Sequence, residues 1–200
     1  MKVRVATACA AVLLVVGFVS AAVAQPRTID LTRFEEAILA FEAEAKASMP
    51  PEGAILVTGS SSIRRWSSME ADLAPLTVIP RGFGGSAMAD VLHYMDRLIM
   101  PYKPRAVVIY EGDNDTGMFG VPPMKIAGEL KQIIRTIHQA LPETRIYVMS
   151  VKPSLARVEN WDKAQETNDL YRQIVDSDDK VRYIDVATPI ASESLARGHR

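Results

Sequence analysis

The chain is poor in cysteine, in histidine and in long apolar runs. It has one cysteine and three histidines in 200 residues. The cysteine, Cys9, lies near the N-terminus, so a disulfide scaffold is excluded and stability must come from a hydrophobic core. Beyond the N-terminal segment, no apolar run is long enough to span a bilayer.

The chain also has no excess of charge of either sign. It carries 23 Lys and Arg against 24 Asp and Glu, a formal net charge of −1. Because nucleic-acid-binding domains usually carry a basic excess, we expect no nucleic-acid partner. The length and a hydrophobic content of 48% fit one ordinary globular domain.

Residues 1–24 have the layout of a secretory signal peptide. Lys2 and Arg4 form a positive start, a segment of apolar and small residues covers 6–22, and a small-x-small cleavage site follows. Cleavage would remove the single cysteine, and with it any cysteine nucleophile, and would change the formal charge from −1 to −3. We therefore expect a secreted or periplasmic domain over 25–200, without a stable membrane span.

Strand and helix patterns alternate along that domain. Short apolar runs predict strands at 54–58, 76–79, 106–110, 145–149 and 181–186. Apolar residues at helical spacing predict helices at 30–48, 67–73, 86–99, 122–141 and 164–175. Thr32 and Glu35 have capping-box spacing in the first helix. Apolar strands that alternate with helices are typical of a parallel sheet covered on both faces, so we expect a three-layer α/β/α sandwich.

Three loops rich in glycine and polar residues each follow a predicted strand. They are Gly59-Ser60-Ser61-Ser62, then 81–86 (Arg-Gly-Phe-Gly-Gly-Ser), and Gly112-Asp113-Asn114-Asp115. Ligands of open α/β sheets bind beyond the carboxyl ends of the strands, where such loops meet. Acyl transfer from an ester needs a nucleophile and two or three hydrogen-bond donors aimed at one point. The three loops could supply both.

These loops, in this order, resemble the sequence blocks of the SGNH hydrolases, also called GDSL esterases and lipases. Gly59-Ser60-Ser61 aligns with the family's Gly-Asp-Ser, with Ser60 in place of the aspartate. Gly112-Asp113-Asn114-Asp115 matches its Gly-x-Asn-Asp. The resemblance covers roughly 54–186, and it implies the flavodoxin-like SGNH fold with a five-stranded parallel sheet.

The resemblance also implies roles for individual residues. Ser61 would be the nucleophile, while the Gly85 N–H and the Asn114 side-chain amide would donate to the oxyanion with the Ser61 N–H. A slip of one residue would replace Gly85 by Gly84. The implied substrate is a small-molecule ester, such as a small acyl, acetyl-sugar or lipid ester, and no metal or cofactor is implied. The sequence gives no indication of oligomeric state.

The base that a serine nucleophile requires is missing from the expected place. The family supplies a histidine, with an aspartate three residues before it, after the fifth strand. The histidines here are His93 and His138, at polar or border positions of their helices, and His199, which has Ala196 at the aspartate position. We therefore expect a chain that ends before the family's last block and turns esters over weakly.

Three other interpretations bear on the same loops. Gly82-Phe83-Gly84-Gly85-Ser86-Ala87 fits a dinucleotide fingerprint, although it follows the second strand and a secreted protein seldom uses a soluble nicotinamide cofactor. Asp113 and Asp115 do not form an EF-hand loop, because Met118 stands where that loop needs glycine. A non-catalytic module that holds a carbohydrate or acyl ligand in the same cleft stays open, because the histidine is missing.

Two further polar features receive no catalytic role from the sequence. Lys152-Pro153-Ser154, after the fourth strand, resembles a subgroup of the same family but suggests no chemistry. Asn168 falls on the apolar side of its helix, so it must be hydrogen-bonded if it is buried. We interpret Asn168 as structural.

Overall fold

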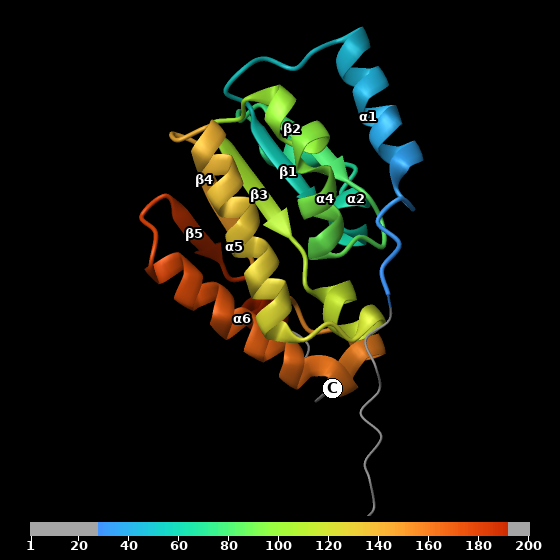
Figure 1. The fold of residues 1–200 in the computed structure, drawn as a ribbon, viewed down its shortest axis with the longest axis vertical. Coiled ribbons are helices and arrows are strands. Elements are labelled where there is room, and N and C mark those ends of the chain that lie inside the picture. The colour runs from blue at the N-terminus through green and yellow to red at the C-terminus, as the bar shows by residue number, and fades with distance from the viewer. Residues whose placement is uncertain (1–27, 192–200) are drawn as a thin grey trace, which may run out of the picture.

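The computed structural model describes residues 28–191. Five parallel strands form one sheet in the order β2-β1-β3-β4-β5 (Figure 1). They are β1 (Ile55–Gly59), β2 (Val78–Gly82), β3 (Ala106–Tyr110), β4 (Arg145–Met149) and β5 (Val181–Ile184). The predicted five-stranded parallel sheet and mixed α/β class are confirmed. The predicted signal peptide lies outside the described residues.

Four long helices and several short ones pack around the sheet or on one another. The long helices are α1 (Glu35–Ala47), α4 (Met88–Leu98), α5 (Pro123–Ala140) and α6 (Trp161–Asp176). The short elements are α2 (Ser61–Arg64), α3 (Met69–Asp72), η1 (Met100–Tyr102), η2 (Asp115–Phe119) and η3 (Leu155–Asn160). No helix within 28–191 is long and apolar enough to cross a membrane.

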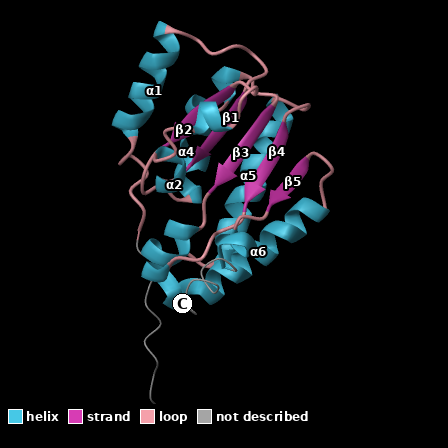
Figure 2. Ribbon diagram, turned by 180° about the vertical axis from the view of Figure 1, so that it is seen from behind, coloured by secondary structure: helices cyan, strands magenta, loops and turns pink. Residues whose placement is uncertain are grey.

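The two faces of the sheet are covered unequally. Helices α4, α5 and α6 pack on one face, where strand residues such as Leu56, Val107 and Ile146 are fully buried (Figure 1). On the other face, Ile63 of α2 and Met69 of α3 pack against β1 and β2. Over β3, β4 and β5 none of the described helices lies on that face (Figure 2). The helical layer on this face consists of α2 and α3, which have only four residues each, so it is thin.

The strand register brings the three predicted loops to one level at the carboxyl edge. Gly59 at the end of central strand β1 pairs with Gly82 of β2 and with Tyr110 of β3. The Phe83 N–H donates to the Gly59 carbonyl (3.0 Å), and the Ser60 N–H donates to the Tyr110 carbonyl (3.3 Å). A Cβ atom on Gly59 would lie 2.3 Å from the Tyr110 oxygen, so this close approach requires glycine.

The first helix begins later than the sequence predicts, at Glu35 rather than residue 30. The Asp30 carboxylate accepts hydrogen bonds from the Thr32 N–H (2.9 Å) and from the Thr32 hydroxyl (2.7 Å). The Thr32 side chain therefore closes a local turn with Asp30 instead of accepting from the helix N-terminus. The predicted capping box is wrong.

Strands β2 and β5 also differ from prediction, and β2 begins at Val78 rather than at residue 76. Strand β2 continues through Pro80 to Gly82, which is possible because β2 is an edge strand and a proline there breaks no ladder on its outer side. Strand β5 ends at Ile184, two residues early. The Asp185 carboxylate accepts from the N–H groups of Ala187 and Thr188 (both 3.0 Å), where the chain turns into a helix.

Candidate active site

Ser61 lies directly beyond the carboxyl end of the central strand. It begins α2, and its side chain is partly exposed, whereas the preceding Ser60 is 1% exposed. As the first residue of a helical turn, Ser61 has an N–H group without an intrahelical acceptor. Because β1 lies between β2 and β3, the loops that follow those two strands flank Ser61.

Asn114 joins the second and third loops. Its side chain is buried, with the residue 3% exposed. The amide nitrogen Nδ2 donates to the Ser86 carbonyl (2.8 Å), and the amide oxygen accepts from Arg157 Nη2 (2.8 Å). A side-chain amide carries two N–H groups, so one donor remains for a further partner.

Gly85 requires glycine for its backbone conformation, whereas Gly84 packs against a side chain. Gly85 has φ +95°, in the left-handed region, and its carbonyl accepts from Arg33 Nη2 (3.3 Å). A Cβ atom on Gly84 would lie 2.9 Å from Arg64 Nε. The bond from Asn114 to Ser86, the residue after Gly85, brings this glycine turn to the side-chain amide.

Two buried carboxyl groups support these loops. Glu111 accepts a hydrogen bond from the Ser86 hydroxyl (2.5 Å). Asp115 accepts from the backbone N–H groups of Met88 (2.9 Å) and Gly112 (3.0 Å). Burial, which disfavours the charged form, raises the pKa of Asp115 to about 7 and raises the pKa of Glu111 well above its usual range; the neighbouring Asp115 raises it further. Burial therefore favours the neutral form of both carboxyl groups.

Glu111→Gln is expected to flatten the pH dependence of stability. The raised folded-state pKa means that the folded protein keeps a proton that the unfolded chain releases. This contribution is complete below the ordinary pKa of about 4.5 and is lost as pH rises through the folded-state value. The substituted glutamine would still accept from Ser86 but could not ionise. Between pH 5 and pH 8, the wild type should therefore lose more unfolding free energy in urea than the variant.

The exposed Glu70 offers a control for that experiment, because Glu70→Gln removes a carboxylate that lies in solvent. This variant should keep the wild-type pH dependence. Equal pH dependence in the wild type and Glu111→Gln would contradict a protonated Glu111 in the folded state.

His138 lies at the opposite edge of the sheet from Ser61. Its Nε2 is 3.1 Å from the carbonyl oxygen of Thr144, which precedes β4, and its Nδ1 is 3.5 Å from the Asp178 carboxylate. The chain thus contains a His–Asp pair, but at the amino ends of the strands. It cannot act on a group at the carboxyl ends.

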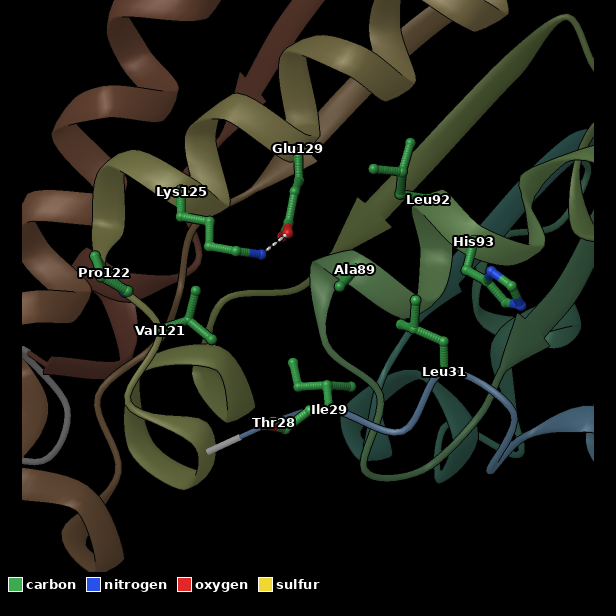
Figure 3. Close-up of a pocket in the computed structure, with 10 residues that line it drawn as sticks. All are labelled: Thr28, Ile29, Leu31, Ala89, Leu92, His93, Val121, Pro122, Lys125 and Glu129. Atoms are coloured by element: carbon green, nitrogen blue, oxygen red, sulfur yellow. Dashed lines mark hydrogen bonds and ion pairs between the residues drawn. The ribbon is translucent and has the colours of Figure 1, made fainter. Parts of the chain in front are cut away.

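His93 lies on α4, at the margin of a surface groove. The groove lies between 28–31, α4 and the start of α5, where Lys125 and Glu129 form an ion pair (Figure 3). None of the three predicted catalytic residues lines it. His199, with Ala196 before it, lies outside the described residues. Within 28–191, therefore, no histidine stands beside Ser61.

The start of α4 does not fit a dinucleotide. A phosphate at a helix N-terminus needs free backbone N–H groups. Here the Ala87 N–H donates to the Asp90 carboxylate (2.8 Å) and the Met88 N–H donates to Asp115. The two acidic side chains occupy the donors that a pyrophosphate would need.

The sequence profile of the GDSL-like Lipase/Acylhydrolase family matches residues 52–199. The chain belongs to this family. Membership makes it, at family level, an esterase- or lipase-type hydrolase, for which small-molecule esters are the expected substrates.

Solved structures share the fold. A Streptococcus pneumonia protein named for platelet activating factor has a TM-score of 0.69 and 21% identity over 78% of this chain and 76% of its own. A GDSL-like lipase from Bacteroides thetaiotaomicron has a TM-score of 0.65 and 18% identity over 80% of each chain. AlinE4, an SGNH-hydrolase family esterase, has a TM-score of 0.56 and 18% identity over 68% of this chain and 77% of its own. No curated protein matches the chain.

Several polar groups around the candidate site carry no signal in the sequence. Ser86, Glu111 and Arg157 contact one another's loops only through the fold, and Lys152-Pro153-Ser154 lies just before Arg157. Asn168 is 3% exposed and makes two hydrogen bonds to the Val151 backbone, at 2.8 and 3.0 Å, as its structural interpretation requires.

Proposed function

We propose that this chain is an exported serine ester hydrolase that acts through an acyl-enzyme. The observation that carries the proposal is the hydrogen bond from Asn114 Nδ2 to the Ser86 carbonyl (2.8 Å). It ties the loops after β2 and β3 together on either side of the loop that carries Ser61. The substrate would be a small acyl, acetyl-sugar or lipid ester.

In the proposed reaction, Ser61 Oγ attacks the ester carbonyl carbon while its proton passes to a base or to water. The carbonyl oxygen becomes an oxyanion that accepts from the second Asn114 N–H and from the Gly85 and Ser61 N–H groups. Collapse expels the alcohol and leaves the acyl group on Ser61. Water then attacks the acyl carbon and releases the carboxylic acid, and Ser61 is restored.

A second function, a non-catalytic module that binds a carbohydrate or acyl ligand, is favoured by one observation. Neither His93 nor His138 lies beside Ser61, and a serine hydroxyl without a base is a weak nucleophile. This function uses the same loops and predicts ligand binding without covalent modification.

A fluorophosphonate reagent distinguishes the two functions. In a hydrolase, Ser61 Oγ forms a bond to phosphorus and fluoride is expelled. Each chain then gains the mass of one phosphonyl group. We expect peptide mapping by mass spectrometry to place that mass on Ser61. A chain that binds acyl or carbohydrate ligands but gains no phosphonyl group would be a binding module instead.

Export is tested separately. Cleavage after residue 24 predicts a mature protein that begins at Gln25, which intact-mass measurement of a periplasmic or culture-medium fraction checks. A chain that keeps Met1 and stays with the cytoplasmic fraction would contradict export without affecting the proposed chemistry.

A further inference from the structure

Arg157 links two consecutive residues of the third loop. It lies in η3, on the connection that follows β4, and its side chain is 24% exposed. Its Nη2 donates to the Asn114 amide oxygen (2.8 Å), and its Nη1 lies 2.8 Å from Asp113 Oδ1. One planar guanidinium thus forms an ion pair with the Asp113 carboxylate and a hydrogen bond with the Asn114 amide, which a lysine ammonium cannot do with the same geometry.

The amide of Asn114 has one favourable orientation between its neighbours. A guanidinium has only donors, so the group that faces Arg157 must be the amide oxygen. The Ser86 carbonyl has only acceptors, so the group that faces it must be the amide nitrogen. Turning the amide by 180° would place donors against donors and oxygen against oxygen.

We propose that Arg157 is a positioning residue that fixes the Asn114 amide so that its free N–H is presented to the oxyanion. The inference rests on the proposed function and adds a residue to it. Without Arg157, only the hydrogen bond to Ser86 holds the Asn114 amide, and the amide can rotate out of this orientation. The oxyanion would then lose a donor for part of the time, although Asn114 itself is still present.

The Arg157 side chain packs against Gly117, where a larger residue would leave it no room. A Cβ atom on Gly117 would lie 2.5 Å from Arg157 Cδ and 3.1 Å from Nε. Gly117 does not have a positive φ, so its backbone can accommodate alanine and the arginine side chain is the obstacle. Gly117→Ala should therefore displace Arg157 without removing any of its polar groups.

The test compares Arg157→Ala and Gly117→Ala with the matched control Gly128→Ala, which adds the same methyl group where nothing lies within 4 Å. Arg157→Ala should slow fluorophosphonate acylation of Ser61 by about 10- to 100-fold, the effect of a misplaced catalytic group. The reagent concentration at half-saturation should change by less than about twofold. Gly117→Ala should slow acylation by about 3- to 10-fold, and Gly128→Ala should not.

A double-mutant cycle decides whether Arg157 acts through Asn114. If it does, Arg157→Ala should change the acylation rate by less than about twofold when Asn114 is already replaced by alanine. Added guanidinium ion should restore part of the rate to Arg157→Ala but not to Asn114→Ala. Equal losses in both backgrounds, or no loss in either single variant, would overturn the proposal.

A measurement on the amide itself keeps the inference separate from the proposed function. The Asn114 NH₂ signals in a ¹⁵N spectrum, assigned with Asn114→Ala, should be dispersed and slow to exchange in the wild type. They should shift and exchange faster in Arg157→Ala and Gly117→Ala. Changed amide signals in a protein that never modifies Ser61 would support the positioning role and reject the hydrolase. Unchanged amide signals in a protein whose Ser61 is modified would support the hydrolase and reject the positioning role of Arg157.

Discussion

Ser61→Ala is expected to abolish fluorophosphonate labelling and to remove all serine-dependent hydrolysis of nitrophenyl acetate. Ser61 begins α2 at the end of the central strand, between the two loops that Asn114 joins. Wild-type turnover itself should be slow, because neither His93 nor His138 can take the Ser61 proton. Labelling over hours is the more sensitive measurement, since it counts a single attack per chain.

Ser62→Ala is the matched control, because Ser62 lies in the same helical turn and is also partly exposed. It should keep the label and the wild-type acylation rate. Labelling that survives Ser61→Ala but is lost in Ser62→Ala would identify Ser62, not Ser61, as the nucleophile. Fast turnover by the wild type would show that a base lies outside 28–191, and His199→Ala would then test the remaining histidine.

The strands could be predicted because each is a short run of apolar residues buried by its neighbours. The loops were found because the sheet brings the residues after β1, β2 and β3 to one edge, whatever the details of packing. The predicted boundaries of helices and strands were wrong where a nearby side chain forms a local hydrogen bond that the pattern does not show. Thr32 has the spacing of a helix cap, but the nearer Asp30 carboxylate binds its hydroxyl.

Arg157 could not be predicted from its own segment. It contacts Asn114 across 43 residues of sequence, and an arginine in a polar loop is usually solvated. Glu111 shows the same difficulty, since a carboxylate after a strand predicts an exposed charge, whereas this one is 1% exposed and hydrogen-bonded to Ser86. Both roles depend on long-range contacts between loops.

Asn114→Ala is expected to slow acylation of Ser61 by about 100- to 1,000-fold, or roughly 3–4 kcal/mol of barrier. The loss follows from the amide geometry. Nδ2 donates one N–H to the Ser86 carbonyl and has a second N–H that can donate to the oxyanion, whereas an alanine side chain has no donor. The reagent concentration at half-saturation should change little, because the donor acts when negative charge develops on the oxygen.

Asn168→Ala separates this chemical effect from a general loss of structure. Asn114 and Asn168 are both 3% exposed, and each makes two hydrogen bonds through its amide. Each substitution should therefore lower the unfolding free energy by about 1–3 kcal/mol. Only Asn114→Ala should slow acylation, because Asn168 holds the Val151 backbone and has no bond to the Ser86 loop. Similar slowing in both variants would assign Asn114 a structural role and leave the oxyanion to the backbone N–H groups.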